Sequence, residues 1–183
     1  GSNRLKRVTD PFLRPTTYAY DGSGNLKRIQ DVAGRLTTFT VDGTGRLTQK
    51  VSCSLCVTDL RYDSLNRLVA QIDSTGRRTS FAFDSSDRVK RVQEPGGAIT
   101  TIAYVSSTVQ RIQDARGALT TNTFNVDQTM KRSQDPQGKI TSFTWSSGRV
   151  TRVIDPLLQR TTLSYLTGAG TVQLLKALHQ PLG

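Results

Sequence analysis

Residues that commonly carry chemistry are few in this sequence. Among 183 residues there are two cysteines and one histidine. Cys53 and Cys56 have the Cys-x-x-Cys spacing, which occurs in zinc sites and in redox-active disulfides. Zinc usually takes four protein ligands, and the only histidine, His179, lies far along the chain. We therefore interpret the pair as turn cysteines or a local disulfide, with redox and metal-binding roles as the alternatives.

Acidic residues recur singly, each within a turn-forming segment. Hydrolysis by paired carboxylates needs two acids that face one cleft, and a serine triad needs a nucleophile motif, which is missing here. The glycine-rich segment at 43–45 lacks the strand, helix and lysine of a phosphate-binding loop. The sequence therefore predicts no enzyme, no catalytic residue, no cofactor and no metal site.

Basic residues are in excess, with 25 Lys and Arg against 14 Asp and Glu and a net charge of +11. The arginines are spread along the chain at two recurring positions. One position holds Arg7, Arg28, Arg91, Arg111, Arg132 and Arg152, and the other holds Arg4, Arg46, Arg67, Arg88 and Arg149. We favour cross-strand pairing with the periodic acids. The alternatives are a row that contacts a polyanion or glycan, for which Arg28, Arg91, Arg111 and Arg132 are the candidates, and a row that contacts an acidic enclosed polypeptide. Because no single patch concentrates the charge, nucleic acid is not the expected partner.

The elements that position these residues follow from an internal repeat. An apolar residue recurs every 20 or 21 residues, at Leu5, Leu26, Leu47, Leu68, Val89, Val109, Met130 and Val150. Eleven positions after each comes a threonine: Thr16, Thr37, Thr58, Thr79, Thr100, Thr120, Thr141 and Thr161. Four positions later lies a mostly aromatic position: Tyr20, Val41, Tyr62, Phe83, Tyr104, Phe124, Trp145 and Tyr165. We interpret these aromatics as the interior of the stacked repeats, with stacking on sugar rings as the alternative.

Turn chemistry defines the repeated unit. An acid follows each opening residue by five positions in seven copies, including Asp31, Asp73, Asp114 and Asp135. The segment 135–138, Asp-Pro-Gln-Gly, fits a type I turn at each position, and a second turn follows the aromatic position, as at 21–24. Segments of about six alternating residues lie between the turns. The sequence therefore predicts an all-β fold of about eight tandem antiparallel β-hairpins, whose long sheet should curve or spiral.

Two segments carry a family resemblance. Residues 20–26 (Tyr-Asp-Gly-Ser-Gly-Asn-Leu) and 62–68 (Tyr-Asp-Ser-Leu-Asn-Arg-Leu), each followed by an acid and then by Thr-x-aromatic, closely resemble the YD repeat of the RHS family. The resemblance covers residues 4 to 166. It implies a β-sheet shell that encloses or presents a toxin polypeptide, as in Rhs-type polymorphic toxins and insecticidal Tc-type toxins, with a related shell in teneurins.

The resemblance also sets the functional expectation. It implies a non-catalytic structural segment, secreted or at the cell surface as part of a larger protein. The implied partners are the rest of the parent shell and an enclosed toxin polypeptide. An adhesive binding module for glycans or polyanionic surfaces is the alternative. Exposed strand edges also invite self-association.

The chain departs from the repeat in a few places. The third copy has Ser52 in place of the acid, and the sixth has Asn122 where a Phe is usual. We expect residues 1–3 to be a leader with a cleavage remnant, 4–166 to be the repeat array, and 167–183 to be a tail or a divergent ninth repeat. The segment 172–178 has a short helical apolar pattern, and no apolar run is long enough to span a membrane.

Overall fold

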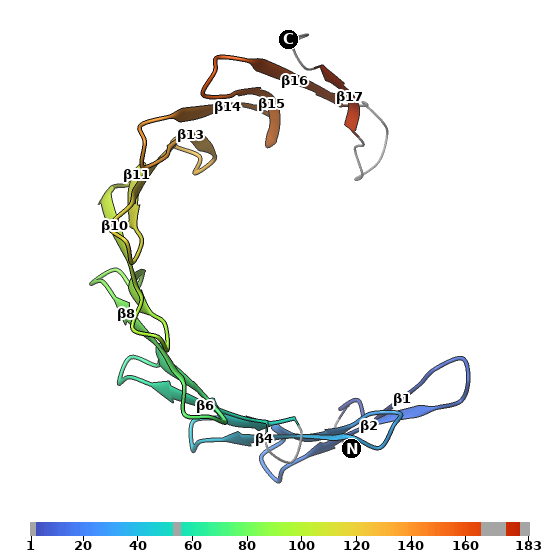
Figure 1. The fold of residues 1–183 in the computed structure, drawn as a ribbon. Helices are drawn as coiled ribbons and strands as arrows, with labels where there is room; N and C mark the ends of the chain where they lie inside the picture. The colour runs from blue at the N-terminus through green and yellow to red at the C-terminus, as the bar shows by residue number, and fades with distance from the viewer. Residues whose placement is uncertain (1–2, 53–55, 166–174, 180–183) are drawn as a thin grey trace. The chain divides into compact units, whose positions relative to one another are not determined.

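The computed structural model describes residues 3–52, 56–165 and 175–179, and all regular structure in them is β-strand. The chain divides into two units, residues 1–97 and 98–183. The first unit has nine strands (Figure 1): β1 (Arg7–Thr9), β2 (Pro15–Tyr20), β3 (Leu26–Gln30), β4 (Leu36–Val41), β5 (Leu47–Val51), β6 (Val57–Tyr62), β7 (Leu68–Asp73), β8 (Arg78–Phe83) and β9 (Val89–Gln93). The second has eight: β10 (Ile99–Ser106), β11 (Val109–Gln113), β12 (Leu119–Phe124), β13 (Met130–Gln134), β14 (Ile140–Ser146), β15 (Arg149–Ile154), β16 (Arg160–Tyr165) and β17 (Leu175–His179).

Within each unit, every strand pairs antiparallel with the strand that follows it in the sequence. The register shifts by one residue beside the aromatic position, for example between Ala19 and Tyr20 and between Arg61 and Tyr62. Such a β-bulge inserts one extra residue and increases the local twist. The predicted tandem antiparallel hairpins are therefore confirmed, and most of them carry the same irregularity just before the aromatic position, whereas the β10–β11 hairpin has it after Tyr104.

Most turns of the two kinds share one backbone conformation, and the turn between Ser146 and Arg149, with positive φ at both Ser147 and Gly148, is an exception. In the turn that starts at Asp21, the Gly24 N–H donates to the Asp21 carbonyl at 3.0 Å, and the Asp21 N–H donates to the Asn25 carbonyl at 2.9 Å. Gly24 has a φ of 90°. These are the features of a type I turn followed by a left-handed residue, the usual three-residue hairpin loop. The predicted turn at 135–138 is the same, since the Gly138 N–H donates to the Asp135 carbonyl at 3.0 Å.

Each hairpin has one apolar and one polar face. In β4, Thr37, Phe39 and Val41 alternate with Leu36, Thr38 and Thr40, so the first three share a face. The threonine, the apolar residue and the residue at the aromatic position of this strand therefore point the same way. The other face, called here the arginine face, carries the strand position of Arg28, which pairs with Thr38.

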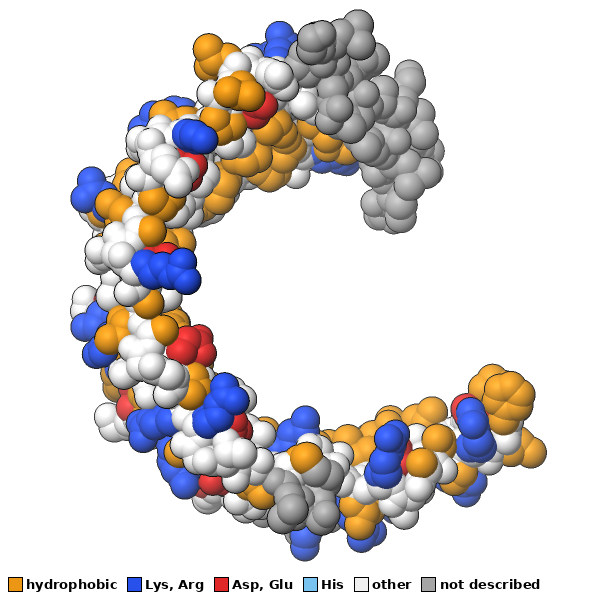
Figure 2. All heavy atoms as spheres, in the orientation of Figure 1, with side chains coloured by type: hydrophobic (Ala, Val, Ile, Leu, Met, Phe, Trp, Pro, Cys, Tyr) orange, Lys and Arg blue, Asp and Glu red, His pale blue; other side chains and the backbone are white. Residues whose placement is uncertain are grey.

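The described residues of each unit form a single sheet layer with no second layer over it. Among the described residues, Ala70 is the only buried hydrophobic residue and no large side chain is fully buried. Figure 2 accordingly shows hydrophobic side chains at the surface of both units. Contacts between neighbouring strands, together with the turn hydrogen bonds, must therefore supply most of the stability that a packed core supplies elsewhere.

The last strand corrects one expectation. Residues 175–179 form β17 instead of continuing the predicted helical pattern, and β17 pairs with β16. Tyr165 lies opposite Leu175, as Tyr20 lies opposite Leu26, with the same bulge beside the aromatic residue. The strand thus pairs with β16 in the way that β3 pairs with β2. Residues 172–174 of the predicted helical segment lie outside the described residues.

The remaining features of the sequence are local. Cys56 is disulfide-bonded, whereas Cys53 lies outside the described residues. The Ser52 N–H donates to the Cys56 carbonyl at 3.1 Å, so the third turn keeps its outer hydrogen bond although it lacks the acid. The described part of the chain contains no helix of the length and hydropathy that would cross a membrane.

Candidate functional site

The aspartate that follows the aromatic residue organises its own turn. Asp63 accepts hydrogen bonds through Oδ1 from the N–H groups of Leu65 at 2.9 Å and Arg67 at 3.0 Å. Its Oδ2 accepts from Arg67 Nε at 2.8 Å. The hydrogen bond from the Arg67 backbone is the main reason why the pKa of Asp63 lies below its ordinary value, and the Arg67 side chain adds to it. The carboxylate is therefore fully committed to the turn.

The arginine of this turn also contacts the next repeat. Arg67 Nη1 donates to Asp87 Oδ1 at 2.7 Å, and its guanidinium lies 4.9 Å from the centre of the Phe83 ring. The pKa of Arg67 lies above its ordinary value, mainly because of the hydrogen bond to Asp63 and also because of the one to Asp87. This makes a repeated Asp–Arg–aromatic triad, in which one repeat's turn positions a cation over the ring of the following repeat.

The same triad occurs one repeat earlier in the first unit. Arg46 pairs with Asp42 at 2.7 Å, lies 5.1 Å from the centre of the Tyr62 ring and donates to Asn66 Oδ1 at 2.6 Å. A hydrogen bond from the Thr44 hydroxyl is the main reason that the pKa of Asp42 is lowered. The recurring spacing of Asp followed four residues later by Arg would have revealed the ion pair from the sequence alone.

The aromatic residues are tied to the sheet as well. Tyr62 Oη donates to the Leu47 carbonyl at 2.9 Å, and Tyr165 Oη donates to the Val150 carbonyl at 2.8 Å. Trp145 uses Nε1 for the same contact. All the predicted repeat threonines and aromatics are half-buried in the structure: Thr16, Thr37, Thr58, Thr79, Thr100, Thr120, Thr141, Thr161, Tyr20, Tyr62, Phe83, Tyr104, Phe124, Trp145 and Tyr165. Rings with a cation over one face and a tethered polar end suit a structural role within the repeat.

The predicted turn acids hold their turns. Asp31 and Asp73 each accept hydrogen bonds from two N–H groups of their own turn, and Asp114 and Asp135 do the same. The pKa of Asp31 is lowered mainly by the side chain of Arg35. These acids therefore bond within their own turns rather than with arginines on neighbouring strands.

The arginines of the arginine face behave differently from those of the triads. Arg28, Arg91, Arg111 and Arg132 are exposed, and none forms an ion pair with a described carboxylate. The expected cross-strand pairing with the periodic acids is therefore wrong for these four residues. The physical reason is that the acids already accept hydrogen bonds within their own turns. Basic side chains are consequently available along this face, and Figure 2 shows Lys and Arg side chains distributed along both units.

One polar cluster interrupts the apolar face of the second unit. Asn122, which is 9% exposed, takes the place of the usual apolar residue and lies opposite Ser133 and Gln110. Ser133 Oγ donates to Asn122 Oδ1 at 2.8 Å, and Asn122 Nδ2 donates to Gln110 Oε1 at 3.5 Å. The sequence alone identifies Asn122 as a departure from the repeat, whereas its partners, Ser133 and Gln110, follow from the strand register.

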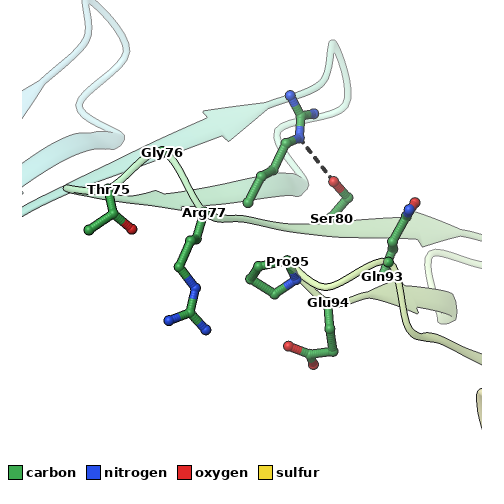
Figure 3. A pocket seen from close by; sticks show the side chains of 9 residues that line it. Thr75, Gly76, Arg77, Ser80, Gln93, Glu94 and Pro95 are labelled. Atoms are coloured by element: carbon green, nitrogen blue, oxygen red, sulfur yellow. Dashed lines mark hydrogen bonds between the residues drawn. The ribbon is translucent and has the colours of Figure 1, made fainter.

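A hollow of about 580 Å³ lies between two turns of the first unit. Its lining includes Arg77, Arg78, Ser80 and Glu94, and Arg78 Nε donates to Ser80 Oγ at 2.9 Å (Figure 3). Figure 3 shows Arg77 and Glu94 extended on the same side of the two turns. No nucleophile with an adjacent base lines it, and the described residues contain no group of three metal-ligating side chains.

Comparison with known proteins agrees with this architecture. Residues 1–35 and 62–99 match the family model described as RHS Repeat. A Photorhabdus luminescens Tc holotoxin pore matches at 12% identity with a TM-score of 0.65, over 88% of this chain and 10% of that one. The TcdB2-TccC3-Cdc42 crystal structure matches at 11% identity with a TM-score of 0.56, over 87% of this chain and 11% of that one. Comparison with curated proteins finds no matching sequence.

These matches concern different levels of similarity. At such low identities the two solved structures share the fold with this chain, which spans about a tenth of their length. The family match, in contrast, falls on the segments that contain the Tyr-Asp turns at 20–24 and 62–66. The residue pattern and the register of the hairpins outside the matched segments are similar to those within residues 1–35 and 62–99, which match the RHS Repeat family model.

Proposed function

We propose that this chain is a segment of a protein wall that encloses or presents another polypeptide. The observation that carries the proposal is the single-layered sheet, which is stabilised through its turns and strand neighbours and leaves both faces partly exposed. A structure of this kind can serve as a boundary between two spaces without a core of its own. The fold shared with a Tc holotoxin pore supports the same role.

The chemistry of the described residues supports a non-catalytic role. The turn acids are occupied by backbone N–H groups and arginines, as at Asp63 and Asp135. The polar ends of Tyr62, Trp145 and Tyr165 are tethered to carbonyl groups. The residue types that a hydrolase would use are therefore already engaged in holding the hairpins. We infer that the chain has a structural role outside the cell, as part of a larger protein.

Protease protection of the full-length protein that contains this segment tests the proposal. The protein is treated with trypsin, and the protected polypeptide is identified by mass spectrometry. The same protein with Asp42→Ala, Asp63→Ala and Asp84→Ala, which opens three turns, is the comparison. We expect a stretch outside the repeats to be protected in the native protein and cleaved in the variant. Equal cleavage of all non-repeat segments in both proteins would refute the wall.

A second candidate function is an adhesive module for glycans or polyanionic surfaces. Arg28, Arg91 and Arg111 favour it, because they are exposed and form no ion pair with a described carboxylate. Binding to heparin should then fall steeply with salt and should weaken when these three residues are replaced by Gln. Heparin binding that is insensitive to these replacements would exclude the adhesive role of the arginine face.

A further inference from the structure

We propose that the arginine face of the second unit binds the carboxylates of an acidic, extended polypeptide. The inference rests on the proposed function, because an enclosed or presented polypeptide is the partner that a wall would contact. It goes further by naming the surface, its chemistry and the spacing of the charges that it recognises.

The strand register places three arginines on one side of the sheet. Arg111 in β11 lies opposite Thr121, and two residues along the same strand Thr123 lies opposite Arg132 in β13. Arg132 lies opposite Ser142, and Thr144 of the same strand lies opposite Arg152 in β15. Because paired residues and residues two apart share a face, all of them belong to one surface.

Hydroxyl groups alternate with the arginines across this surface. Arg111 and Arg132 are exposed, and Arg132 Nε donates to Thr123 Oγ1 at 3.4 Å, which keeps the guanidinium along the sheet. A guanidinium offers parallel N–H donors that match a carboxylate, and neighbouring hydroxyls can donate to the remaining oxygen lone pairs. The surface therefore presents donors and positive charge suited to carboxylate groups.

No acid competes for these arginines. The strands β10 to β16 contain neither Asp nor Glu, and the four acids of the second unit lie in turns. Those four, Asp114, Asp127, Asp135 and Asp155, each accept hydrogen bonds from N–H groups of their own turns. The face thus carries an uncompensated positive charge.

The spacing of the charges favours a polypeptide over a nucleic acid. Arginines on every second strand are about 12 Å apart, since neighbouring strands lie about 4.8 Å apart and the register also offsets these arginines by two residues along the strand. Residues four apart in an extended polypeptide point the same way and are separated by about 13 Å, so Glu or Asp at every fourth position would match the row. Duplex DNA carries one charge per about 1.7 Å of its axis, which is far denser than this face.

The first unit shows that this row is not a necessary consequence of the repeat. At the position of Arg111 and Arg132 it has Gln49 and Ala70 in its third and fourth repeats. Gln49 Nε2 donates to Asp59 Oδ1 at 2.9 Å, and Ala70 is fully buried. The fold therefore forms without arginine at this position, which leaves the row of the second unit free to serve a partner.

The test measures binding of a fluorescent synthetic peptide with Glu at every fourth position by anisotropy. Arg111→Gln/Arg132→Gln is compared with Arg116→Gln/Lys139→Gln, which removes the same charge from exposed turn residues of the same unit. We expect roughly a fivefold weaker affinity for the first variant and less than about a twofold change for the second. Circular dichroism checks that both double variants are folded. If the first is not folded, Arg132→Lys, which keeps the charge, is measured in its place.

The control ligands distinguish the alternatives. A peptide with Gln in place of Glu should not bind, and one with all its Glu in a single block should bind more weakly than the spaced one. Equal losses of peptide affinity in the two double variants would overturn the proposal. It would also be overturned if Arg111→Gln/Arg132→Gln weakened the binding of single-stranded DNA or heparin more than the binding of the peptide. The protease protection of the native protein does not depend on these arginines, so either idea can fail while the other stands.

Discussion

The hydroxyl of Tyr62 donates a hydrogen bond to the main-chain carbonyl of Leu47, 15 residues earlier, at 2.9 Å. Tyr20 and Leu5 have the same relationship in the first hairpin, at 2.8 Å. The bond joins an aromatic side chain to the opening residue of the preceding strand and fixes the end of the hairpin. A repeat with phenylalanine at this position, such as the one with Phe83, lacks it.

The first prediction exchanges these two side chains. Tyr62→Phe should lower the free energy of unfolding by about 1 kcal/mol, because it removes the hydrogen bond while Arg46 remains over the ring. Phe83→Tyr should raise it by up to about 1 kcal/mol, since its hydroxyl would face the Leu68 carbonyl, 15 residues earlier. Urea denaturation measures both. A destabilised Phe83→Tyr would show that the relationship does not transfer between repeats.

The second prediction concerns the strained turn at 155–158. Leu158 has a φ of 64° and is 83% exposed, whereas the corresponding residue in most of these turns is glycine. Left-handed backbone costs a non-glycine residue about 1 kcal/mol or more, so Leu158→Gly should stabilise the protein by about that amount. The neighbouring Leu157, 78% exposed with no positive φ, provides the control. Leu157→Gly should give no gain, and an equal gain from both would point to loss of exposed apolar surface instead of strain.

The third prediction uses the polar cluster around Asn122. Asn122→Val should be destabilising because it leaves the Ser133 hydroxyl without its acceptor. Ser133→Val should likewise be destabilising, because it removes the hydroxyl that donates to the Asn122 carboxamide. The double replacement restores the apolar face found in other repeats. A double-mutant cycle should therefore give a coupling energy of about 1 kcal/mol or more. Strictly additive effects would mean that the two side chains are energetically independent.

The fourth prediction is a loss of stability in acid. The pKa values of Asp42, Asp63 and Asp84 are lowered in the folded protein, while unfolded aspartate titrates near pH 3.9. Their stabilisation is therefore complete above about pH 4 and is lost as the pH falls through the depressed folded values. Denaturation midpoints measured between neutral pH and about pH 2 should show this decline.

Asp63→Asn provides the control for this pH dependence. Asn keeps an acceptor for the turn N–H groups but does not ionise, and Asn125 already holds the corresponding position in the sixth repeat. The variant should be less stable than the native protein at neutral pH and should lose less stability in acid. An unchanged pH profile would remove Asp63 from the explanation.

Much of the fold follows from local pattern. The spacing of Thr37, Phe39 and Val41 and the turn residues at 135–138 are local signals, and the structure confirms the face and the turn that they predict. The contacts of the arginines are harder to predict from the sequence, because they depend on where the chain returns after a turn. Arg67 returns to Asp63 through the left-handed residue of the turn and reaches Phe83 through the strand pairing. The Asp-to-Arg spacing of four residues indicates the first relationship, whereas no local pattern in the sequence reveals the contact with Phe83.

Two other features were hidden for similar reasons. The partner of Asn122 is 11 residues away, and its identity depends on a register that includes a bulge. Leu175 opens a strand 10 residues after Tyr165, whereas Leu26 does so 6 residues after Tyr20. The longer connection removed the repeat period that identified the other strands, and the apolar pattern that remained resembled a helix.

Strand contacts that reach only the next strand have an evolutionary consequence. In the described part of each unit, every strand contacts its neighbours in sequence and no distant strand. Duplication, deletion or exchange of a whole hairpin therefore disturbs two junctions and no shared interior. The size of such an array can drift by unequal recombination between copies, and a damaged copy harms its immediate surroundings while the rest of the ladder stays intact.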